Sequence, residues 1–231
     1  MRHPTPPIVS VILPVRDGER YLDEAVRSVL GQELAELELV IVDDGSTDST
    51  PRIAASYPAA RYLRLEPCGV SAARNAGVQA SRGEYLAFLD ADDVWHPAKL
   101  RSQVDILRRH AEIGYVTCQA ELFLQKGCER PASLKPELFS SPQPALIPSA
   151  LCVRRSVFER VGPFDPRLAL SEDTDWFLRA KDAGFIHHLL PEVLVRKRVH
   201  PGSVSLRGTP GPSPLLSVLR DSIHRRRDGR A

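Results

Sequence analysis

Residues 83–95 read GEYLAFLDADDVW, a short apolar run that ends in three carboxylates. The run at 85–89 predicts a buried strand, and Asp90, Asp92 and Asp93 follow it directly. Because alternate side chains of a strand point to one side, Asp90 and Asp92 can face a single point. Carboxylates placed in this way, together with substrate phosphates, are usual ligands of Mg²⁺ in proteins. By itself such an acidic group is more often a solvated turn than a metal site, so the choice between the two depends on the other motifs of the chain.

Strand and helix patterns alternate along the chain. Apolar, β-branched runs predict strands, and apolar residues at helical spacing predict helices, the first ending at Gly31 and the second capped by Ser46 or Asp48. Short connections between them indicate an α/β domain with a mainly parallel sheet flanked by helices. The predicted strands are 8–15, 37–42, 60–65, 85–89, 113–123, 150–153 and 185–199, and the predicted helices are 19–30, a segment ending near 57, 71–80, 97–110, 156–160 and 173–183.

Three of the predicted strands end in polar or acidic residues. These ends are Arg16-Asp17, Asp43-Asp44 and Asp90-Ala91-Asp92. In parallel α/β sheets, ligands bind beyond the carboxyl ends of the strands. We therefore expect the three ends to form one ligand site.

Composition excludes several classes of protein. A formal net charge of +2 over 231 residues is too small to argue for nucleic acid as a partner. No apolar stretch is long enough to span a bilayer, and residues 1–7 lack a secretory apolar region. The four cysteines, at 68, 118, 128 and 152, have no metal-ligand spacing, which is typical of reduced thiols in a cytoplasmic protein.

The chain divides into an extension at 1–7, a domain at 8–206 and a tail at 207–231. The tail is rich in Pro and Gly and then basic, and we expect it to be poorly ordered, although such a basic end could also contact a membrane peripherally. Residues 125–148 lack periodicity and predict a long loop, of the kind that often forms a lid or a binding loop.

Four motifs occur in order and at regular spacing: VILPV at 11–15, VDDGSTD at 42–48, SAARNAG at 71–77 and LDADD at 89–93. Further on come Glu172-Asp173 ahead of Trp176, and RVHPGSVS at 198–205. Together they resemble the family 2 glycosyltransferases, which have the GT-A fold and use nucleotide-sugar donors. The resemblance covers residues 8–205 and implies a nucleotide-binding half at 8–95 and an acceptor-binding half at 96–206.

The resemblance implies a divalent cation, Mg²⁺ or Mn²⁺, that bridges the donor diphosphate. Asp92 would bind this metal, Asp90 would lie nearer the ribose and the metal, and Ala91 separates the two. His200 would reach the metal or the diphosphate, although a lone histidine is more often structural. Ser203 and Ser205 would help to hold the loop that carries His200, or a phosphate.

The resemblance also implies a nucleotide site, with UDP the favoured nucleotide. Asp43 and Asp44 would contact the pyrimidine and ribose, and we expect one of them to cap the following helix instead. Arg74 would reach the nucleotide unless it is a surface charge of its helix. Pro14 and Val15 would form a wall for the base. Arg16-Asp17 stands where the family often has Tyr-Asn, so the base contacts there are in doubt.

For catalysis the resemblance points to Glu172-Asp173, with Asp173 as the general base of an inverting transfer. Acids in the first turn of a helix also stabilise the helix dipole, and Asp175 could serve that role. Trp176 either lines the acceptor site or packs in the core. The Gln-x-x-Arg-Trp motif and membrane spans of processive members are absent from the sequence, so a single transfer is expected.

Two alternatives come from other classes. A sugar nucleotidyltransferase should carry a Gly-rich, basic phosphate loop after the first strand, and residues 14–20 lack one. A catalytically silent scaffold of the same fold would not need Asp90, Asp92, Asp173 and His200 together. The acceptor, whether a glycan, a lipid-linked sugar, a peptide or a small molecule, is not encoded in any readable motif.

Overall fold

The structure is a computed structural model that describes residues 7–168, 170–203 and 214–228. Strands and helices alternate in the first half, as the apolar patterns predict: β1 (Val9–Val15), α1 (Leu22–Leu30), β2 (Leu37–Asp43), α2 (Thr50–Ala55), β3 (Ala60–Arg64), α3 (Val70–Ala80) and β4 (Tyr85–Phe88). The second half contains β5 (Val94–Trp95), α4 (Lys99–Arg109), β6 (Ile113–Leu124), β7 (Gln143–Pro144), β8 (Cys152–Arg154), α5 (Arg155–Val161), α6 (Glu172–Asp182), β9 (Ile186–Val199) and α7 (Pro214–Asp228).

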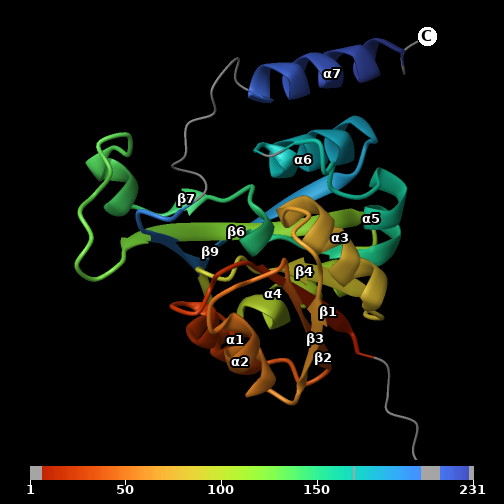
Figure 1. The fold of residues 1–231 in the computed structure, drawn as a ribbon. Coiled ribbons are helices and arrows are strands. Elements are labelled where there is room, and N and C mark those ends of the chain that lie inside the picture. Colours follow the sequence, from red (N-terminus) through yellow and green to blue (C-terminus); the bar gives the residue numbers. More distant parts are fainter. Residues whose placement is uncertain (1–6, 169, 204–213, 229–231) are drawn as a thin grey trace, which may run out of the picture.

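The strands form one sheet in the order β3-β2-β1-β4-β8-β6-β9-β5, with β7 paired to β6 (Figure 1). β1 to β4 run parallel, which confirms the predicted parallel α/β arrangement. Beyond β4 the sheet is mixed, because β8 runs antiparallel to both β4 and β6 while β9 runs parallel to β6. The carboxyl ends of β1, β2 and β4 therefore meet at one edge, as the sequence predicts.

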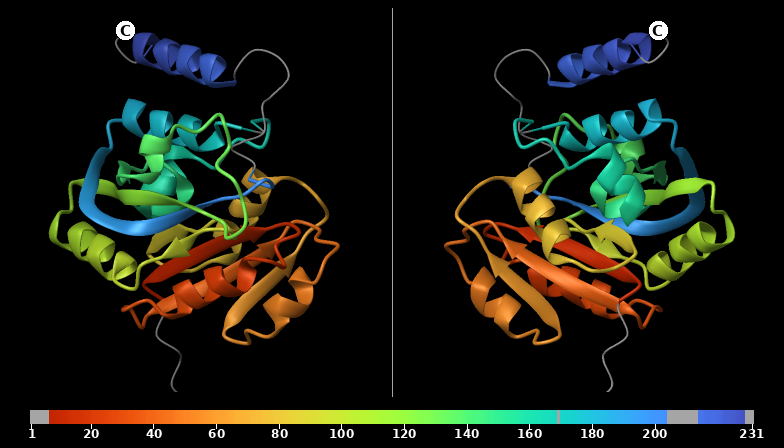
Figure 2. Two further views of the ribbon diagram at one scale, coloured as in Figure 1. Left: turned by 90° about the vertical axis from the view of Figure 1, so that its left-hand side faces the viewer. Right: turned by 90° about the vertical axis from the view of Figure 1, so that its right-hand side faces the viewer.

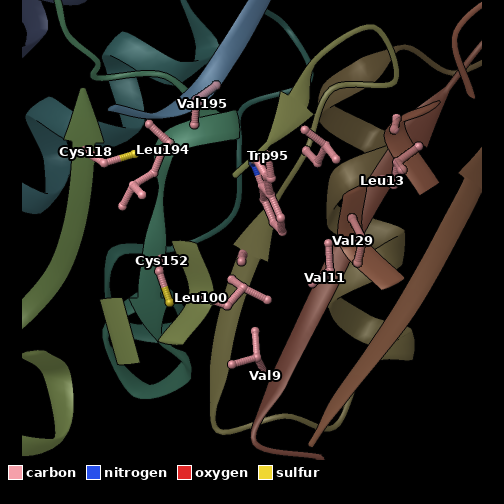
Figure 3. Close-up of a cluster of buried hydrophobic side chains, with 14 of the residues drawn as sticks. Val9, Val11, Leu13, Val29, Trp95, Leu100, Cys118, Cys152, Leu194 and Val195 are labelled. Carbon is pink, nitrogen blue, oxygen red and sulfur yellow. The ribbon is translucent and has the colours of Figure 1, made fainter. Parts of the chain in front are cut away.

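Central strands buried on both faces give continuous apolar runs, and here the alternating side chains supply two core layers. One layer packs against α1 and α4, and Figure 3 shows Leu13 of β1 in it together with Val29 and Leu100. The other layer contains Ile12 of β1 and the fully buried Trp176, and it packs against α3, α5 and α6. The indole thus packs in the core, and the alternative that it lines an open acceptor site is wrong.

The helix ends agree in part with the predicted caps. The N–H of Gly31 donates to the carbonyl of Arg27 at the end of α1 (2.9 Å). Asp48 Oδ1 accepts the N–H of Thr50 at the start of α2 (2.9 Å). Ser46 does not take this role, because its Oγ accepts the N–H of Asp17 instead.

The expectation of a poorly ordered tail is wrong for residues 214–228, which form α7 against α6. Its apolar residues recur at helical spacing, and a proline such as Pro214 is favourable in a first helical turn. The predicted excursion at 125–148 holds only β7, a short 3-10 turn at Pro136–Phe139 and the first residue of another at Pro148–Ala150. No helix in the described residues is long and apolar enough to cross a membrane.

Lys99, the first residue of α4, is fully buried. Lys99 Nζ donates to Gln103 Oε1 (2.9 Å) and lies 3.9 Å from the centroid of the Trp95 ring. Burial lowers the pKa of Lys99 to about 8, an effect that the nearby Cys118 and Cys152 offset only in part. Both cysteines are free thiols. At neutral pH the buried, charged ammonium of Lys99 therefore lowers the stability of the folded state.

We expect Lys99→Met to raise the free energy of unfolding near pH 7 by about 1–3 kcal/mol. Each unit by which burial lowers the pKa of Lys99 corresponds to about 1.4 kcal/mol, and the loss of the contact with the Trp95 ring offsets part of this gain. The unfolded chain binds this proton more tightly, so wild-type stability rises between about pH 8 and the ordinary lysine value of 10.5. The advantage of the variant should shrink across that window. Urea unfolding at both ends of the window measures it, and an advantage that stays constant would contradict a charged Lys99.

Candidate functional site

The acidic stretch after β4 is a turn and not a continued strand. β4 ends before it, and the N–H of Asp93 donates to the carbonyl of Asp90 (3.0 Å). The expected strand alternation of Asp90 and Asp92 is therefore wrong. Each carboxylate instead meets a basic side chain from a distant element, Asp90 with Arg74 of α3 and Asp92 with His200 after β9.

Arg74 connects the turn to the start of α6. Its Nη2 lies 2.7 Å from Asp90 Oδ1 and its Nη1 lies 2.8 Å from Glu172 Oε1. Burial lowers the pKa of Arg74, but the two carboxylates outweigh it and the net change is upward, so the buried cation is retained. Its Nε is buried and has no hydrogen-bond partner in the described part of the chain. One donor of this guanidinium is thus not used by the protein.

His200 contacts Asp92 through Nε2, which lies 3.1 Å from Asp92 Oδ2. The N–H of Gly202 donates to Nδ1 (3.1 Å), so the proton of the neutral ring is on Nε2 and is donated to Asp92. Ser203 holds this loop as expected, since its Oγ accepts the N–H of His200 (3.1 Å). Ser205, expected to help, lies outside the described residues.

Asp93 is the buried centre of a network that sequence reasoning missed. Ser149 Oγ donates to Asp93 Oδ2 (2.7 Å), the N–H of Arg198 donates to Oδ1 (3.1 Å), and Lys197 Nζ lies 3.7 Å from Oδ2. Burial raises the pKa of Asp93 to about 7 against the opposing charge of Lys197, and the two neighbouring carboxylates of the turn add to the rise. These contacts fix the acidic turn to β9.

Arg198 supports both members of the Asp92–His200 pair. Its Nε donates to the carbonyl of Asp92 (2.9 Å), and its Nη2 forms an ion pair with Glu24 of α1. Its guanidinium carbon lies 4.9 Å from the centroid of the Tyr21 ring, and that ring lies 4.6 Å from the ring of His200. Arg198 was quoted within the sequence motif but was assigned no role.

Asp43 and Asp44 lie at the same edge, but protein groups already bind them. Asp43 accepts the N–H of Ser46 (2.7 Å) and the hydroxyl of Tyr62 (2.5 Å), whereas Asp44 accepts two backbone N–H groups just before α3 (2.6 and 3.0 Å). Burial would raise the pKa of Asp43, but the hydrogen bonds and a nearby arginine hold it below its ordinary value. Neither caps α2, so that expectation is wrong, and Asp44 stabilises the start of α3 instead.

The end of β1 is partly core and partly loop. Pro14 and Val15 are buried, Val15 within the apolar layer under α1. Asp17 has a φ of 48°, and its Oδ1 accepts an N–H from the loop after β2 (2.8 Å). The side chain of Arg16 is 54% exposed, and Ala91 is half-buried between Asp90 and Asp92 in the acidic turn. The two predicted wall residues, Pro14 and Val15, are thus buried, whereas the side chains of Arg16 and Asp17 are exposed.

Glu172 and Asp173 begin α6 after a residue in an uncommon conformation, Ser171 with a φ of 70°. Glu172 turns toward Arg74, where burial raises its pKa and the guanidinium opposes the rise. Asp173 is half-buried, and its Oδ1 accepts the N–H of Thr174 (2.6 Å). No lysine, arginine or histidine of the described ranges forms an ion pair with Asp173. In the same helix Asp175 pairs with Arg179 (2.8 Å).

Lys197 of β9 brings these segments into one electrostatic neighbourhood. Asp93 raises its pKa most, burial lowers it, and Asp90, Asp92 and Asp173 raise it further. The turn after β4 and the start of α6 thus act on one ammonium group. The direct contact between the two halves of the chain is the one from Glu172 through Arg74 to Asp90.

The side chains of Asp90, Asp92 and His200 suit a divalent cation whose remaining ligands come from a substrate or from water. No three His, Cys, Asp or Glu side chains of the described residues form a ready metal cluster. Within the same residues, Asp90 Oδ2 and Asp92 Oδ1 accept no hydrogen bond, and His200 is adjacent. Oxygen ligands of this kind fit Mg²⁺ or Mn²⁺ when phosphate oxygens or water complete the shell. Coordination through His200 Nε2 would require its proton to move to Nδ1.

Comparison with known proteins gives a consistent result. The family model described as Glycosyl transferase family 2 matches residues 10–141. An uncharacterized glycosyltransferase of Rickettsia prowazekii is 34% identical over 209 residues, which cover 84% of this chain. The chain spans only 64% of the length of that relative.

Two solved structures are similar in fold. S. aureus TarS 1-349 in complex with UDP-GlcNAc superposes with a TM-score of 0.76 at 22% identity, covering 94% of this chain and 66% of that one. Mannosyltransferase PcManGT from Pyrobaculum calidifontis, in complex with GDP-Man and Mn²⁺, superposes with a TM-score of 0.66 at 20% identity, covering 96% and 70%. At such identities the similarity establishes the GT-A type of fold.

Proposed function

Because the chain belongs to glycosyl transferase family 2, we propose that it transfers one sugar from a nucleotide-sugar donor to a hydroxyl group of an acceptor, with inversion at the anomeric carbon. The observation that carries the proposal is a pair of contacts at the carboxyl edge of the sheet: Arg74 with Asp90 and Glu172, and His200 with Asp92. Asp173 follows Glu172 at the start of α6. The similarity to complexes with UDP-GlcNAc and GDP-Man supports a nucleoside diphosphate-sugar as donor, with UDP favoured.

The first half of the chain, 8–95, would bind the nucleotide. Asp43 and Asp44 are almost fully buried among the groups that they bind, so neighbouring side chains would have to move for either to accept from a base N–H or a ribose hydroxyl. The exposed guanidinium of Arg16 would cover the base or the phosphates from the β1 end. Arg74 would act here through Asp90, which it holds by an ion pair, since its own side chain is buried.

Asp92, Asp90 and His200 would hold Mg²⁺ or Mn²⁺. When bound, the cation acts as a Lewis acid that neutralises charge on the departing diphosphate. Burial would raise the pKa of Asp90, but Arg74 and Lys197 hold it below its ordinary value, so this carboxylate remains an anion and a ligand. Arg198 holds the backbone of Asp92 by a hydrogen bond and packs on the ring of Tyr21, which contacts His200.

Asp173 would be the general base. Its carboxylate takes the proton of the acceptor hydroxyl while the oxygen lone pair forms the new bond to the anomeric carbon and the bond to the diphosphate breaks. Glu172 would position it indirectly, through the ion pair with Arg74. Acceptor binding would fall to the second half, 96–206, including the excursion at 125–148.

Calorimetric titration with UDP, GDP and dTDP, each with and without Mn²⁺, tests this assignment. We expect one nucleotide to bind, and to bind far more tightly with the cation. Absence of binding by all three to the folded protein would favour a silent scaffold. Equal binding with and without Mn²⁺ would remove the metal from the proposal.

A further inference from the structure

Helix α7 carries an unusual concentration of exposed apolar side chains. Among the described residues, seven large apolar side chains are exposed, and four of them lie on this one helix. They are Leu215 (40%), Leu216 (66%), Leu219 (41%) and Ile223 (53%). Exposed apolar groups gathered in this way usually mark a surface that something covers.

The helix turns a mainly polar face toward the protein. Asp182 of α6 accepts hydrogen bonds from Ser222 Oγ (2.8 Å), Arg225 Nε (3.0 Å) and Arg226 Nε (2.7 Å). Val218 is the buried apolar residue on this face. Figures 1 and 2 show α7 lying along α6, on the side away from the sheet. Since burial against the protein would favour the opposite orientation of an amphipathic helix, the apolar face is available for another surface.

The exposed residues form a stripe with arginines along one edge. Leu215, Leu219 and Ile223 are spaced by four residues, so they lie on one face of the helix. Arg220 and Arg227 follow Leu216 and Ile223 by four residues, and both are exposed. This edge therefore carries positive charge at the border of the apolar stripe.

We propose that α7 docks in the plane of an anionic lipid surface, with its leucines and isoleucine among the acyl chains and Arg220 and Arg227 at the headgroups. A helix of 15 residues is roughly 22 Å long, too short to span a bilayer but suitable to lie on one. Arginine side chains at such a border extend toward phosphates while their methylene groups cover the apolar stripe. The hydrogen bonds to Asp182 keep α7 on α6 while its apolar face binds the lipid surface.

Positive charge at the edge favours anionic lipid over a second copy of the chain. Two copies pairing through these stripes would bring Arg220 and Arg227 of each near the same arginines of the other, and like charges at an interface are unfavourable. An anionic bilayer offers the opposite charge along the whole edge.

Vesicle sedimentation of the full chain tests the proposal, with vesicles of phosphatidylcholine alone and vesicles of equal phosphatidylcholine and phosphatidylserine. We expect binding to the anionic vesicles, weakened by salt, and weak binding to the neutral ones. The double substitution Leu216→Ser with Leu219→Ser should reduce binding by about 10-fold or more, because both leucines lose their transfer into lipid. Leu30→Ser, on an equally exposed leucine of α1, is the matched control and should bind as wild type.

Two further variants separate the outcomes. Arg220→Gln with Arg227→Gln should lower binding to anionic vesicles to the level of neutral ones. Leu219→Trp should show a blue-shifted fluorescence with anionic vesicles, which reports entry of this face into lipid. No vesicle binding, equal binding to both compositions, or a wild-type dimer in light scattering that Leu219→Ser dissociates would each overturn the proposal.

Discussion

Replacing Asp92 by asparagine is expected to remove the Mn²⁺-dependent part of nucleotide binding. Removal of a residue that only orients a metal ligand typically weakens metal binding by about 10–100-fold, so loss of the proposed ligand itself should cost about 100-fold or more. The amide keeps the size of the side chain and can still accept the hydrogen bond from His200 Nε2. Titration calorimetry of the bound nucleotide with and without Mn²⁺ measures the effect.

The matched control is Asp105→Asn, which removes a carboxylate that pairs with Arg109 (3.6 Å) on the outer side of α4. This variant should bind the nucleotide as the wild type does. If Asp92→Asn binds as tightly as wild type in the presence of Mn²⁺, the cation does not contact Asp92, and the assignment of the acidic turn fails.

Replacing Asp173 by asparagine is expected to lower turnover by about 10²–10⁴-fold, the usual contribution of a general base, while nucleotide binding stays unchanged. The reason is positional, because Asp173 follows Glu172 at the start of α6 and acts on the same Lys197 ammonium as Asp90 and Asp92. In the described chain it has no ion-pair partner of its own, unlike Glu172 and Asp175. Release of nucleoside diphosphate, with water as the acceptor, gives the rate, and calorimetry gives the binding constant.

Glu172→Gln is the informative companion to that variant. Glu172 contacts Arg74, which in turn contacts Asp90, so its loss should disturb nucleotide binding as well as turnover. Turnover of Asp173→Asn within a factor of a few of wild type would exclude Asp173 as the base. A matching loss of nucleotide binding in Asp173→Asn would move this residue to the donor side.

The parallel half of the fold could be predicted because its cause is local. β1, β2 and β4 are buried on both faces, so their sequences are continuous apolar runs that end abruptly in charge. That abrupt end also predicted which residues meet, since parallel strands present their carboxyl ends at one edge. The prediction for the tail was wrong for the opposite reason. Among the described residues, α7 meets α6 through hydrogen bonds to Asp182 and buries a single large apolar side chain, Val218. It therefore has no long apolar stripe that would mark it in the sequence as part of the fold.

The network around Asp93 could not be predicted, because its register is not local. The two-residue strand β5 pairs antiparallel with β9, with Val94 opposite Arg196. That pairing brings Lys197 and Arg198 to Asp93, and a strand of two residues leaves no periodic pattern in the sequence. Ser149 reaches the same carboxylate from the end of the long excursion. Three consecutive basic residues, Arg196 to Arg198, were the one available signal in β9, and they fit an exposed edge equally well.

Transfer with inversion is tested most directly by ¹H NMR of the sugar that the wild-type protein releases from an α-linked nucleotide-sugar, with Mn²⁺ and water as the acceptor. We expect the first sugar to appear to be the β-anomer, because one displacement assisted by Asp173 inverts the anomeric carbon. Initial release of the α-anomer would contradict a single displacement. A folded protein that binds the donor but releases no sugar, with water or with any supplied acceptor, would contradict the proposal of transferase activity.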